Sequence, residues 1–302
     1  MPVVRLAGFL LRLDGWIAGA RPRTLPAAVV PVAVGTAAVS GAIVWWRAIA
    51  AMVVSLALQI ATNYVNDYAD GERGTDKHRV GPVRLVASGL ATAAAVKRAA
   101  LISFAVAGIA GLLLALAVGP ELIVVGAACM AAGWAYTGGP KPYGYHGLGE
   151  VFVFVFFGLV ATIGSTYVHT ESLSGQDGGV SAVAAVPVGL LAVALLVINN
   201  LRDIPTDTET GKRTMAVRLG DAGTRRLFTA LLGGVAVGIV LVSVLWRPWA
   251  AIGLVGLLVA REPLSRVRSG AVGGDLIPAL AGTGKTQLAT GLLLALGLAL
   301  SR

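Results

Sequence analysis

Long apolar runs separated by short charged loops are the feature that most limits how this chain folds. Nine such runs occur, at about residues 24–40, 48–66, 99–118, 121–137, 149–168, 180–200, 227–245, 249–260 and 286–300. A helix needs about 20 mostly apolar residues to cross the hydrocarbon core of a bilayer, in which backbone polar groups must find partners within the protein. We therefore predict an all-α integral membrane protein whose nine transmembrane helices surround a central cavity. The eighth run is short and is the weakest of the nine.

Composition excludes several other classes of protein. The chain is 56% hydrophobic and 13% charged, whereas a soluble domain carries about 25% charged residues. Its one cysteine, Cys129, lies within an apolar run, so a disulfide-stapled module is excluded. The three histidines are scattered and lack the spacing of zinc ligands. A net charge of +9 raises the question of nucleic acid, but the basic residues lie between apolar runs, so we expect no nucleic-acid partner.

The basic residues also indicate an orientation. If the nine runs cross the bilayer in turn, all but three of the 24 Lys and Arg residues fall on one side, the exceptions being Arg47, Arg247 and Arg302. Basic loop residues accumulate on the cytoplasmic side, so we predict a cell-membrane protein with a cytoplasmic N-terminus. Residues 1–20 lack the pattern of a cleavable signal and are expected to form an interfacial helix. The whole chain, 1–302, is then one membrane-embedded domain.

A polar cluster ends the second apolar run. At about 100° per residue, Asn63, Asn66, Asp67 and Asp70 share one face of a helix. One interpretation is a solvated helix end at the point where the chain leaves the membrane. The other is a cation site, because neighbouring carboxylates repel one another unless a cation lies between them. Oxygen ligands of this kind favour Mg²⁺ over zinc.

A second cluster ends the sixth run and repeats the first. Asn199 and Asp203 follow Asn66 and Asp70 at a constant offset of 133 residues, and 83–85 recur as 217–219 at an offset of 134. This pattern predicts two parallel repeats of four helices each, which would bring both clusters to the same face of the membrane. The clusters open two cytoplasmic active-site loops, 67–98 and 200–226. Pro205 is expected to end or kink the sixth helix, leaving Asp207 on a loop.

Basic side chains follow both clusters. Carboxylates bind Mg²⁺, Mg²⁺ bridges phosphate oxygens, and Lys or Arg neutralises the remaining charge. The combination predicts a diphosphate site at the membrane surface. The candidate diphosphate contacts are Arg73, Lys77, Lys212 and Arg213.

These motifs resemble those of the UbiA superfamily of intramembrane prenyltransferases. The general pattern N-D-x-x-D-x-x-x-D is met at Asn66, Asp67 and Asp70, but position 74 is Gly and the last acid is Asp76. That departure resembles the branch that prenylates 1,4-dihydroxy-2-naphthoate in menaquinone synthesis, with N-D-Y-x-D-x-x-x-G-x-D over 66–76. Further strings typical of this branch lie at 20–26, 136–140, 147–150, 199–203, 207, 211–213 and 218–220.

The resemblance implies a chemistry and a set of site residues. It implies transfer of a polyprenyl group from polyprenyl diphosphate to 1,4-dihydroxy-2-naphthoate, with loss of CO₂ and with two Mg²⁺ ions. The expected catalytic acids are Asp67, Asp70, Asp203 and Asp207, and the expected metal ligands add Asn66 and Asn199. Candidates for the acceptor site or for supporting contacts are Asn63, Asp76, Lys141, Tyr136, Tyr143, Arg21 and Arg202.

Several alternatives stay open at this stage. Another aromatic acceptor such as 4-hydroxybenzoate fits the same motifs, and the prenyl length and oligomeric state leave no pattern. A transporter also uses parallel repeats and acids at membrane depth, although no apolar run here carries an acid at its centre. Residues 282–286 hint at a phosphate loop, but Ala279 stands where that motif needs Gly, so they are expected to begin the ninth helix.

Overall fold

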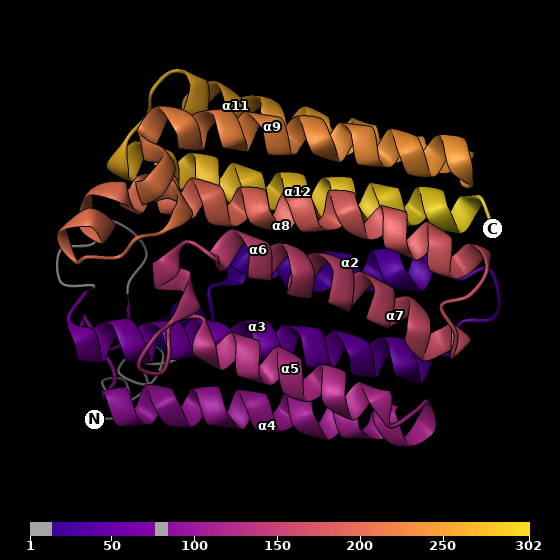
Figure 1. The fold of residues 1–302 in the computed structure, drawn as a ribbon, viewed down its shortest axis with the longest axis horizontal. Helices are drawn as coiled ribbons and strands as arrows, with labels where there is room; N and C mark the ends of the chain where they lie inside the picture. The colour runs from indigo at the N-terminus through magenta and orange to yellow at the C-terminus, as the bar shows by residue number, and fades with distance from the viewer. Residues whose placement is uncertain (1–13, 76–83) are drawn as a thin grey trace, which may run out of the picture.

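The computed structural model describes residues 14–75 and 84–302, and these residues form helices and connecting loops (Figure 1). Every apolar run of the sequence lies largely within helix. The elements are η1 Pro22–Thr24, α2 Pro26–Ala38, α3 Trp45–Arg73, α4 Ala93–Ala117, α5 Glu121–Ala135, η2 Tyr143–His146, α6 Gly149–Val153, η3 Phe154–Val160, α7 Ala161–Thr170, α8 Gln176–Glu209, α9 Met215–Leu245, η4 Pro248–Ile252, α10 Gly253–Gly256, η5 Leu257–Ala260, α11 Arg261–Arg268, η6 Gly273–Asp275 and α12 Leu276–Leu300.

The helices lie side by side along the long axis of the molecule (Figure 1). The closest partners are α3 with α4 and α8 with α9, and α2 packs on α12, α7 and α8. Five helical stretches are long and apolar enough to cross a membrane, and α2 and α5 are shorter apolar helices. The five are Trp45–Arg73, Ala93–Ala117, Gly149–Thr170, Gln176–Glu209 and Met215–Leu245.

Three separate groups of buried side chains stabilise the described part of the bundle. The largest surrounds α8 and includes Leu191, Ile198, Phe228 and Ile239, the second joins α3 to α4, and a small third group lies between α2, α3, α4 and α7. Helix α8 is the best-buried of the long helices, so it is the rigid element on which the site is built. A cavity lies between the two larger groups.

Two predictions about helix ends are wrong. Helix α3 continues to Arg73 and α8 continues to Glu209, so residues 67–73 and 200–209 are helical and not part of loops. Pro205 does not end its helix. Pro205 lies at an exposed position of α8, and the helix continues past the one backbone hydrogen bond that proline removes. The nearby hydroxyls of Thr206 and Thr208 donate to the carbonyls of Asp203 and Ile204.

The C-terminal part of the chain also differs in detail from expectation. The short eighth run forms a mixed 3₁₀ and α segment that continues through α11. Helix α12 begins at Leu276, ten residues before the predicted start of the ninth run, and residues 282–286 lie inside it. They therefore form no phosphate loop. Of the predicted N-terminal helix, 14–20 are helical and the remainder lies outside the described residues.

Candidate active site

This cavity between the two larger groups of buried side chains has a volume of about 660 Å³. Its lining changes character from one end to the other. Around the ends of α3 and α8 it is polar, and toward the opposite end of the bundle it is apolar. The polar lining includes Asn66, Asp67, Asp70, Arg84, Tyr145, Asn199, Asp203, Asp207 and Lys212.

The cluster on α3 is buried and already engaged with the loops around it. Asp67 accepts hydrogen bonds from the backbone N–H groups of Leu85 at 2.8 Å and Val86 at 3.0 Å. Asn66 Oδ1 accepts from Thr137 Oγ1 at 2.5 Å. Asp67 therefore fixes the chain that follows residue 84, and Asn66 fixes the loop after α5. The helical face predicted from the sequence does lie on one wall of the cavity.

A buried arginine outside the cavity lining orients the cluster on α8. Arg202 Nε and Nη2 each donate to one oxygen of Asp203 at 2.7 Å, and Nη2 also donates to Asn199 Oδ1 at 2.9 Å. Arg202 is 4% exposed, and it is absent from the cavity lining that both of its partners share. A bidentate pair of this kind restrains both rotation and position of the carboxylate. Arg202 thus acts on the site through Asp203 and Asn199.

Helices α3 and α8, which carry the two clusters, end in the same way. Gly74 and Gly211, with φ of 69° and 75°, end α3 and α8 in the left-handed conformation that favours glycine. In each case the next residue donates its N–H to a carbonyl five residues back, from Thr75 to Asp70 and from Lys212 to Asp207. Helix α8 is one turn longer than α3 between its Asn and this glycine. The fold-back at Gly211 returns Lys212 to the cavity.

Lys212 connects the two walls. Its ammonium lies 3.3 Å from Asp70 Oδ1 on α3 and 4.0 Å from Asp207 Oδ1 on α8. The lysine is 9% exposed, so the pair is screened less than a surface ion pair. Of the predicted diphosphate contacts within the described part of the chain, Lys212 is the one that lines the cavity.

Tyr145 is a residue of the site that the sequence analysis missed. Its hydroxyl donates to Asp70 Oδ1 at 2.5 Å, and its ring lies 4.7 Å from the Lys212 ammonium and 5.3 Å from the Arg73 guanidinium. Its backbone carbonyl accepts from the N–H of Arg213. Burial, and secondly the charge of Asp70, raises the pKa of the Tyr145 phenol, so it remains a donor at neutral pH. It lies two residues after Tyr143, which the sequence analysis did single out.

Arg84 is a second missed residue. It is 9% exposed and lines the polar end of the cavity beside Asp67 and Asp70. The sequence marked it as one of the basic residues after the first cluster and as a member of the repeated stretch 83–85, but not as a diphosphate contact. Its neighbour Leu85 is held by Asp67, so the same contact that fixes the loop also places this guanidinium at the cavity.

Three other predicted site residues among those described do not line the cavity. Arg73 donates to the carbonyls of Thr137 and Gly139, both at 2.5 Å, and so holds the loop after α5. Arg213 and Lys141 are exposed and do not line the cavity. Asp76 and Lys77 lie outside the described residues.

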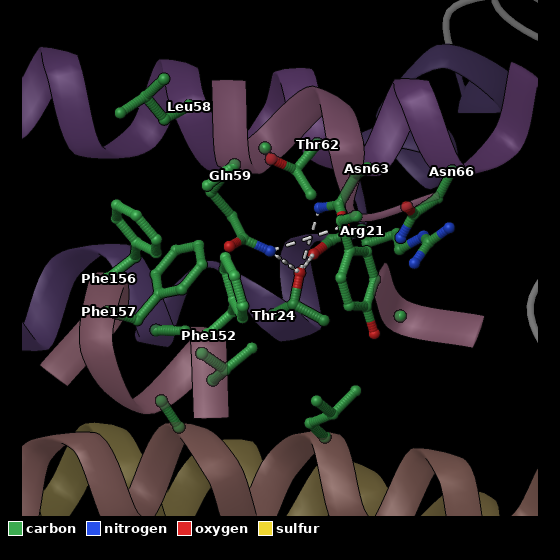
Figure 2. A pocket seen from close by; sticks show the side chains of 18 of the residues that line it. Arg21, Thr24, Leu58, Gln59, Thr62, Asn63, Asn66, Phe152, Phe156 and Phe157 are labelled. Atoms are coloured by element: carbon green, nitrogen blue, oxygen red, sulfur yellow. Dashed lines mark hydrogen bonds between the residues drawn. The ribbon is translucent and has the colours of Figure 1, made fainter. Parts of the chain in front are cut away.

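Arg21 and the polar side chains near it form the middle of the cavity (Figure 2). Asn63 does not join the acid cluster. It donates to Ala20 O at 2.9 Å and to Thr24 Oγ1 at 3.2 Å, and Gln59 donates to the same hydroxyl at 3.0 Å. This network holds the segment that carries Arg21 against α3.

Aromatic side chains face this polar wall. Phe152, Phe156 and Phe157 lie across the cavity from Gln59 (Figure 2). They come from α6 and from η3, a π-helical stretch of a kind often found at functional sites. Tyr136 and Tyr143 also line the cavity. The Tyr143 hydroxyl donates to Ala132 O at 2.9 Å, and its ring stacks on Phe152 at 3.9 Å. Tyr143 therefore supports the aromatic wall.

The carboxylate and amide oxygens of the cavity suit a metal ion that is bound partly by the protein and partly by the substrate. Within 14–75 and 84–302, no three Asp, Glu, His or Cys side chains are close enough together to hold a metal by themselves. Mg²⁺ takes one or two carboxylates, keeps waters and completes its shell with substrate phosphates. Carboxylate and amide oxygens on two facing walls, with a cation already drawn between them, suit a Mg²⁺–diphosphate complex.

Comparisons with known proteins agree with this geometry. The sequence pattern of the UbiA prenyltransferase family matches residues 28–267. The 1,4-dihydroxy-2-naphthoate octaprenyltransferase of Mycobacterium leprae (strain TN) is 54% identical over 272 residues, covering 89% of this chain and 90% of that protein. The Escherichia coli (strain K12) protein of the same name is 36% identical over 96% of this chain and 97% of its own length.

Solved structures share the fold at low sequence identity. A UbiA homolog from Archaeoglobus fulgidus bound to GPP and Mg²⁺ superposes with a TM-score of 0.69 at 13% identity, covering 94% of this chain and 98% of that one. The apo structure of a UbiA homolog from Aeropyrum pernix K1 gives a TM-score of 0.66 at 15% identity, covering 92% and 96%. The helical arrangement is therefore one already known from solved proteins.

Proposed function

The chain belongs to the UbiA prenyltransferase family and is a multi-pass membrane protein, and from this we propose that it transfers a polyprenyl group from polyprenyl diphosphate to 1,4-dihydroxy-2-naphthoate. The product is a demethylmenaquinol, the prenylated intermediate of menaquinone synthesis. The names of relatives 54% and 36% identical over nearly the whole chain support this acceptor over 4-hydroxybenzoate.

One observation carries the assignment to this chain's own residues. Acidic and amide side chains on the ends of α3 and α8 face one cavity, with Lys212 between Asp70 and Asp207. The cavity continues from this polar end into an apolar interior. A polyprenyl diphosphate has the same polarity, with a strongly anionic head on an apolar chain. A transporter would not need a cavity whose polar and apolar ends match those of a reactive diphosphate.

Mg²⁺ is the cofactor in this proposal, as two ions. Asn66, Asp67 and Asp70 would hold one, and Asn199, Asp203 and Asp207 the other. When bound, Mg²⁺ would neutralise the diphosphate oxygens and make diphosphate a better leaving group. The co-structures of the Archaeoglobus fulgidus homolog with Mg²⁺ and DMAPP or GPP support the cofactor.

The protein's own groups then position the donor. Lys212 and Arg84 face the diphosphate and stabilise the charge that develops on it as the allylic C–O bond breaks. Tyr145 holds Asp70, and Arg202 holds Asp203 and Asn199, so that the acids keep their geometry while the charge moves. The aromatic and aliphatic walls exclude water, which would otherwise capture the allylic cation.

The acceptor lies between Arg21 and the aromatic wall. Arg21 binds the naphthoate carboxylate, and the ring packs against Phe152 and Phe156. The ring carbon that bears the carboxylate forms the new bond to the allylic carbon as diphosphate leaves. The electrons of the bond to the carboxylate return to the ring as CO₂ departs, so aromaticity is restored without a base.

The membrane arrangement follows the sequence prediction. We place nine crossings in the cell membrane, with two four-helix repeats, a cytoplasmic N-terminus and the acid clusters at the cytoplasmic surface. The asymmetry of the basic residues supports this placement. Arg47 and Arg247, two of the three exceptions, lie at the opposite end of the bundle from the acids and bind carbonyls at helix C-termini.

Purified protein in detergent or nanodiscs, supplied with Mg²⁺ and radiolabelled polyprenyl diphosphate, tests the proposal. With 1,4-dihydroxy-2-naphthoate we expect label in a quinol product and one CO₂ released per transfer. With 4-hydroxybenzoate we expect transfer at least 100-fold slower. Label on 4-hydroxybenzoate alone would reject this acceptor, and no transfer to either would reject the enzymatic assignment.

A further inference from the structure

Glu150 is a buried acid to which the mechanism above gives no role. It is 5% exposed, lies in the first turn of α6 and does not line the cavity. Within 14–75 and 84–302 no basic side chain forms an ion pair with it. Its Oε1 accepts a hydrogen bond from Asn200 Nδ2 of α8 at 3.0 Å. A buried acid costs free energy unless its oxygens have hydrogen-bond partners, and Asn200 is the residue through which Glu150 can act on the site.

This contact fixes the orientation of the Asn200 amide. A carboxylate only accepts hydrogen bonds, so the amide nitrogen faces Glu150 and the amide oxygen faces away from it. Asn200 is 8% exposed and lines the cavity. None of the hydrogen bonds among the described residues is donated to its Oδ1. The cavity therefore receives a hydrogen-bond acceptor at this position.

Two adjacent asparagines of α8 are oriented by different partners. Asn199 Oδ1 accepts from Arg202, whose guanidinium also holds Asp203. Asn200 is rotated by about 100° from Asn199 around the helix, and it is held by the carboxylate of Glu150. Buried groups of opposite charge thus orient the two amides, with Arg202 on the side of the acids and Glu150 on the side of α6.

The aromatic wall of the cavity begins next to this contact. Phe152, two residues after Glu150, lines the cavity. A Cβ built on Gly149 would lie 3.3 Å from Cε2 of Tyr136, another lining residue. The start of α6 therefore connects both rings to the carboxylate that holds Asn200. The amide oxygen lies on the side of the cavity where the acceptor ring is proposed to pack.

The proposed acceptor carries the kind of group that this oxygen can bind. 1,4-Dihydroxy-2-naphthoate has two ring hydroxyls besides its carboxylate, and each hydroxyl is a hydrogen-bond donor. Arg21 is proposed to bind the carboxylate, and a guanidinium cannot accept a hydrogen bond from a hydroxyl. Burying a hydroxyl without a partner is unfavourable. The ring therefore needs a hydrogen-bond acceptor on the wall against which it packs.

We propose that Asn200 accepts a hydrogen bond from a ring hydroxyl of the aromatic acceptor, and that Glu150 is the positioning residue that keeps the amide oxygen turned toward it. This inference rests on the proposed prenyl transfer and names the residues that recognise the diol. The hydrogen bond orients the ring, and it increases the electron density that the hydroxyl oxygen donates to the ring. A site that binds a hydroxyl in this way rejects analogues that lack it.

Three related inhibitors test the hydroxyl contact. 2-Naphthoate, 1-hydroxy-2-naphthoate and 4-hydroxy-2-naphthoate share the carboxylate and differ only in a hydroxyl. As inhibitors competitive with the acceptor, at least one hydroxynaphthoate should bind the wild type about fivefold or more tightly than 2-naphthoate does. In Asn200→Leu the three inhibition constants should agree within about twofold. A preference for a hydroxynaphthoate that persists in Asn200→Leu, or that is absent from the wild type, would overturn the inference.

The kinetics of Asn200→Leu separate recognition of the acceptor from binding of metal. The KM for 1,4-dihydroxy-2-naphthoate should rise about tenfold or more, while the KM for polyprenyl diphosphate and the Mg²⁺ concentration for half-maximal rate stay within about twofold. A raised Mg²⁺ requirement with an unchanged acceptor KM would indicate a metal ligand and overturn the inference. Asn200→Ala serves for the same measurements if the leucine variant does not elute as folded protein. Wild-type protein inactive with every acceptor would instead reject the proposed function.

Glu150→Gln tests the positioning role. A glutamine amide can donate as well as accept, so it no longer determines which atom of Asn200 faces the cavity. We expect the acceptor KM to rise about threefold or more. The double variant with Asn200→Leu should be no worse than Asn200→Leu alone, because Glu150 acts through Asn200. Losses that add in the double variant would refute the positioning role.

Glu121→Gln is the matched control. The Glu121 carboxylate also accepts a hydrogen bond from a side chain, the Tyr167 hydroxyl at 2.5 Å. It lies at the first residue of α5 and does not line the cavity. This variant should therefore keep the wild-type KM for the acceptor and the wild-type order of the three inhibitors.

Discussion

The ammonium of Lys212 lies 3.3 Å from Oδ1 of Asp70, and this contact joins the two halves of the bundle at the site. Asp70 belongs to α3, and Lys212 follows α8 through the turn at Gly211. The same lysine lies 4.0 Å from Asp207. One cation therefore neutralises acids from both walls where the diphosphate is expected to bind.

Replacing Lys212 by Met should show how much the site depends on this cation. The lysine charge is then missing from between the two carboxylates, so we expect a lower melting temperature in EDTA and a larger rise on adding Mg²⁺ than in the wild type. The KM for polyprenyl diphosphate should rise at least tenfold, about 1.4 kcal/mol. Differential scanning fluorimetry and donor titrations measure the two effects. Lys285→Met, an exposed lysine on α12, should behave as the wild type.

Tyr145→Phe removes the hydroxyl that donates to Asp70 and leaves the ring. A hydrogen bond to a charged group contributes about 1.5–3 kcal/mol, so we expect the Mg²⁺ concentration for half-maximal rate to rise about tenfold or more. Tyr143→Phe is the matched control, because its hydroxyl donates to a backbone carbonyl of α5. That change should alter stability and leave the Mg²⁺ dependence unchanged. Equal Mg²⁺ titrations for both variants would refute the role of Tyr145.

The same tyrosine has a consequence for pH. Burial and Asp70 raise its pKa, so the phenol stays protonated above the usual range for tyrosine. A raised pKa means that the donor is present at neutral and mildly alkaline pH and is lost only at higher pH. The Mg²⁺ requirement of the wild type should therefore not change between about pH 7 and pH 9. A rise in that requirement over this range, absent from Tyr145→Phe, would contradict the assignment.

Arg202 should be replaceable by neither Lys nor Met. Its guanidinium contacts both oxygens of Asp203 and also Asn199, which an ammonium cannot reproduce. We expect Arg202→Lys to lose at least tenfold in kcat and to need more Mg²⁺, while retaining the wild-type melting temperature more closely than Arg202→Met. Wild-type kcat in Arg202→Lys would show that charge alone is required.

Arg21 should govern the acceptor and not the donor. For Arg21→Gln we expect the KM for 1,4-dihydroxy-2-naphthoate to rise at least tenfold while the KM for the donor is unchanged. An acceptor without the carboxylate, 1,4-naphthalenediol, should bind both enzymes equally. If Arg21→Gln impairs both acceptors to the same extent, Arg21 does not recognise the carboxylate.

Helical periodicity predicted the walls of the site well, because the acids lie on regular helices. Asn66, Asp70, Asn199 and Asp203 all line one cavity, as their spacing indicated. Helical periodicity did not predict which groups these side chains hydrogen-bond to. Asn63 shares the face but binds Thr24 and Ala20, since the N-terminal segment packs there. The roles of these residues in catalysis remain predictions.

Contacts made by the loops were not predictable from local sequence patterns. Tyr145 reaches Asp70 across 75 residues of chain, and nothing local marks that contact. Arg73 follows the acids in the sequence, as expected of a phosphate ligand. Its guanidinium instead donates hydrogen bonds to carbonyls of the loop after α5. Pro205 suggested a helix end, but the buried face of α8 outweighs the one backbone bond lost. Tertiary contacts decide each of these cases.

The most direct test of the account is Mg²⁺-dependent prenyl transfer by Asp70→Ala. Transfer from radiolabelled polyprenyl diphosphate to 1,4-dihydroxy-2-naphthoate should be abolished, or reduced at least 1,000-fold (about 4 kcal/mol), in a variant that still elutes as folded protein. Glu209→Ala, an exposed acid at the end of α8, should keep the wild-type rate and Mg²⁺ dependence. Full transfer by folded Asp70→Ala, or wild-type transfer that persists in EDTA, would contradict a metal–diphosphate site between α3 and α8.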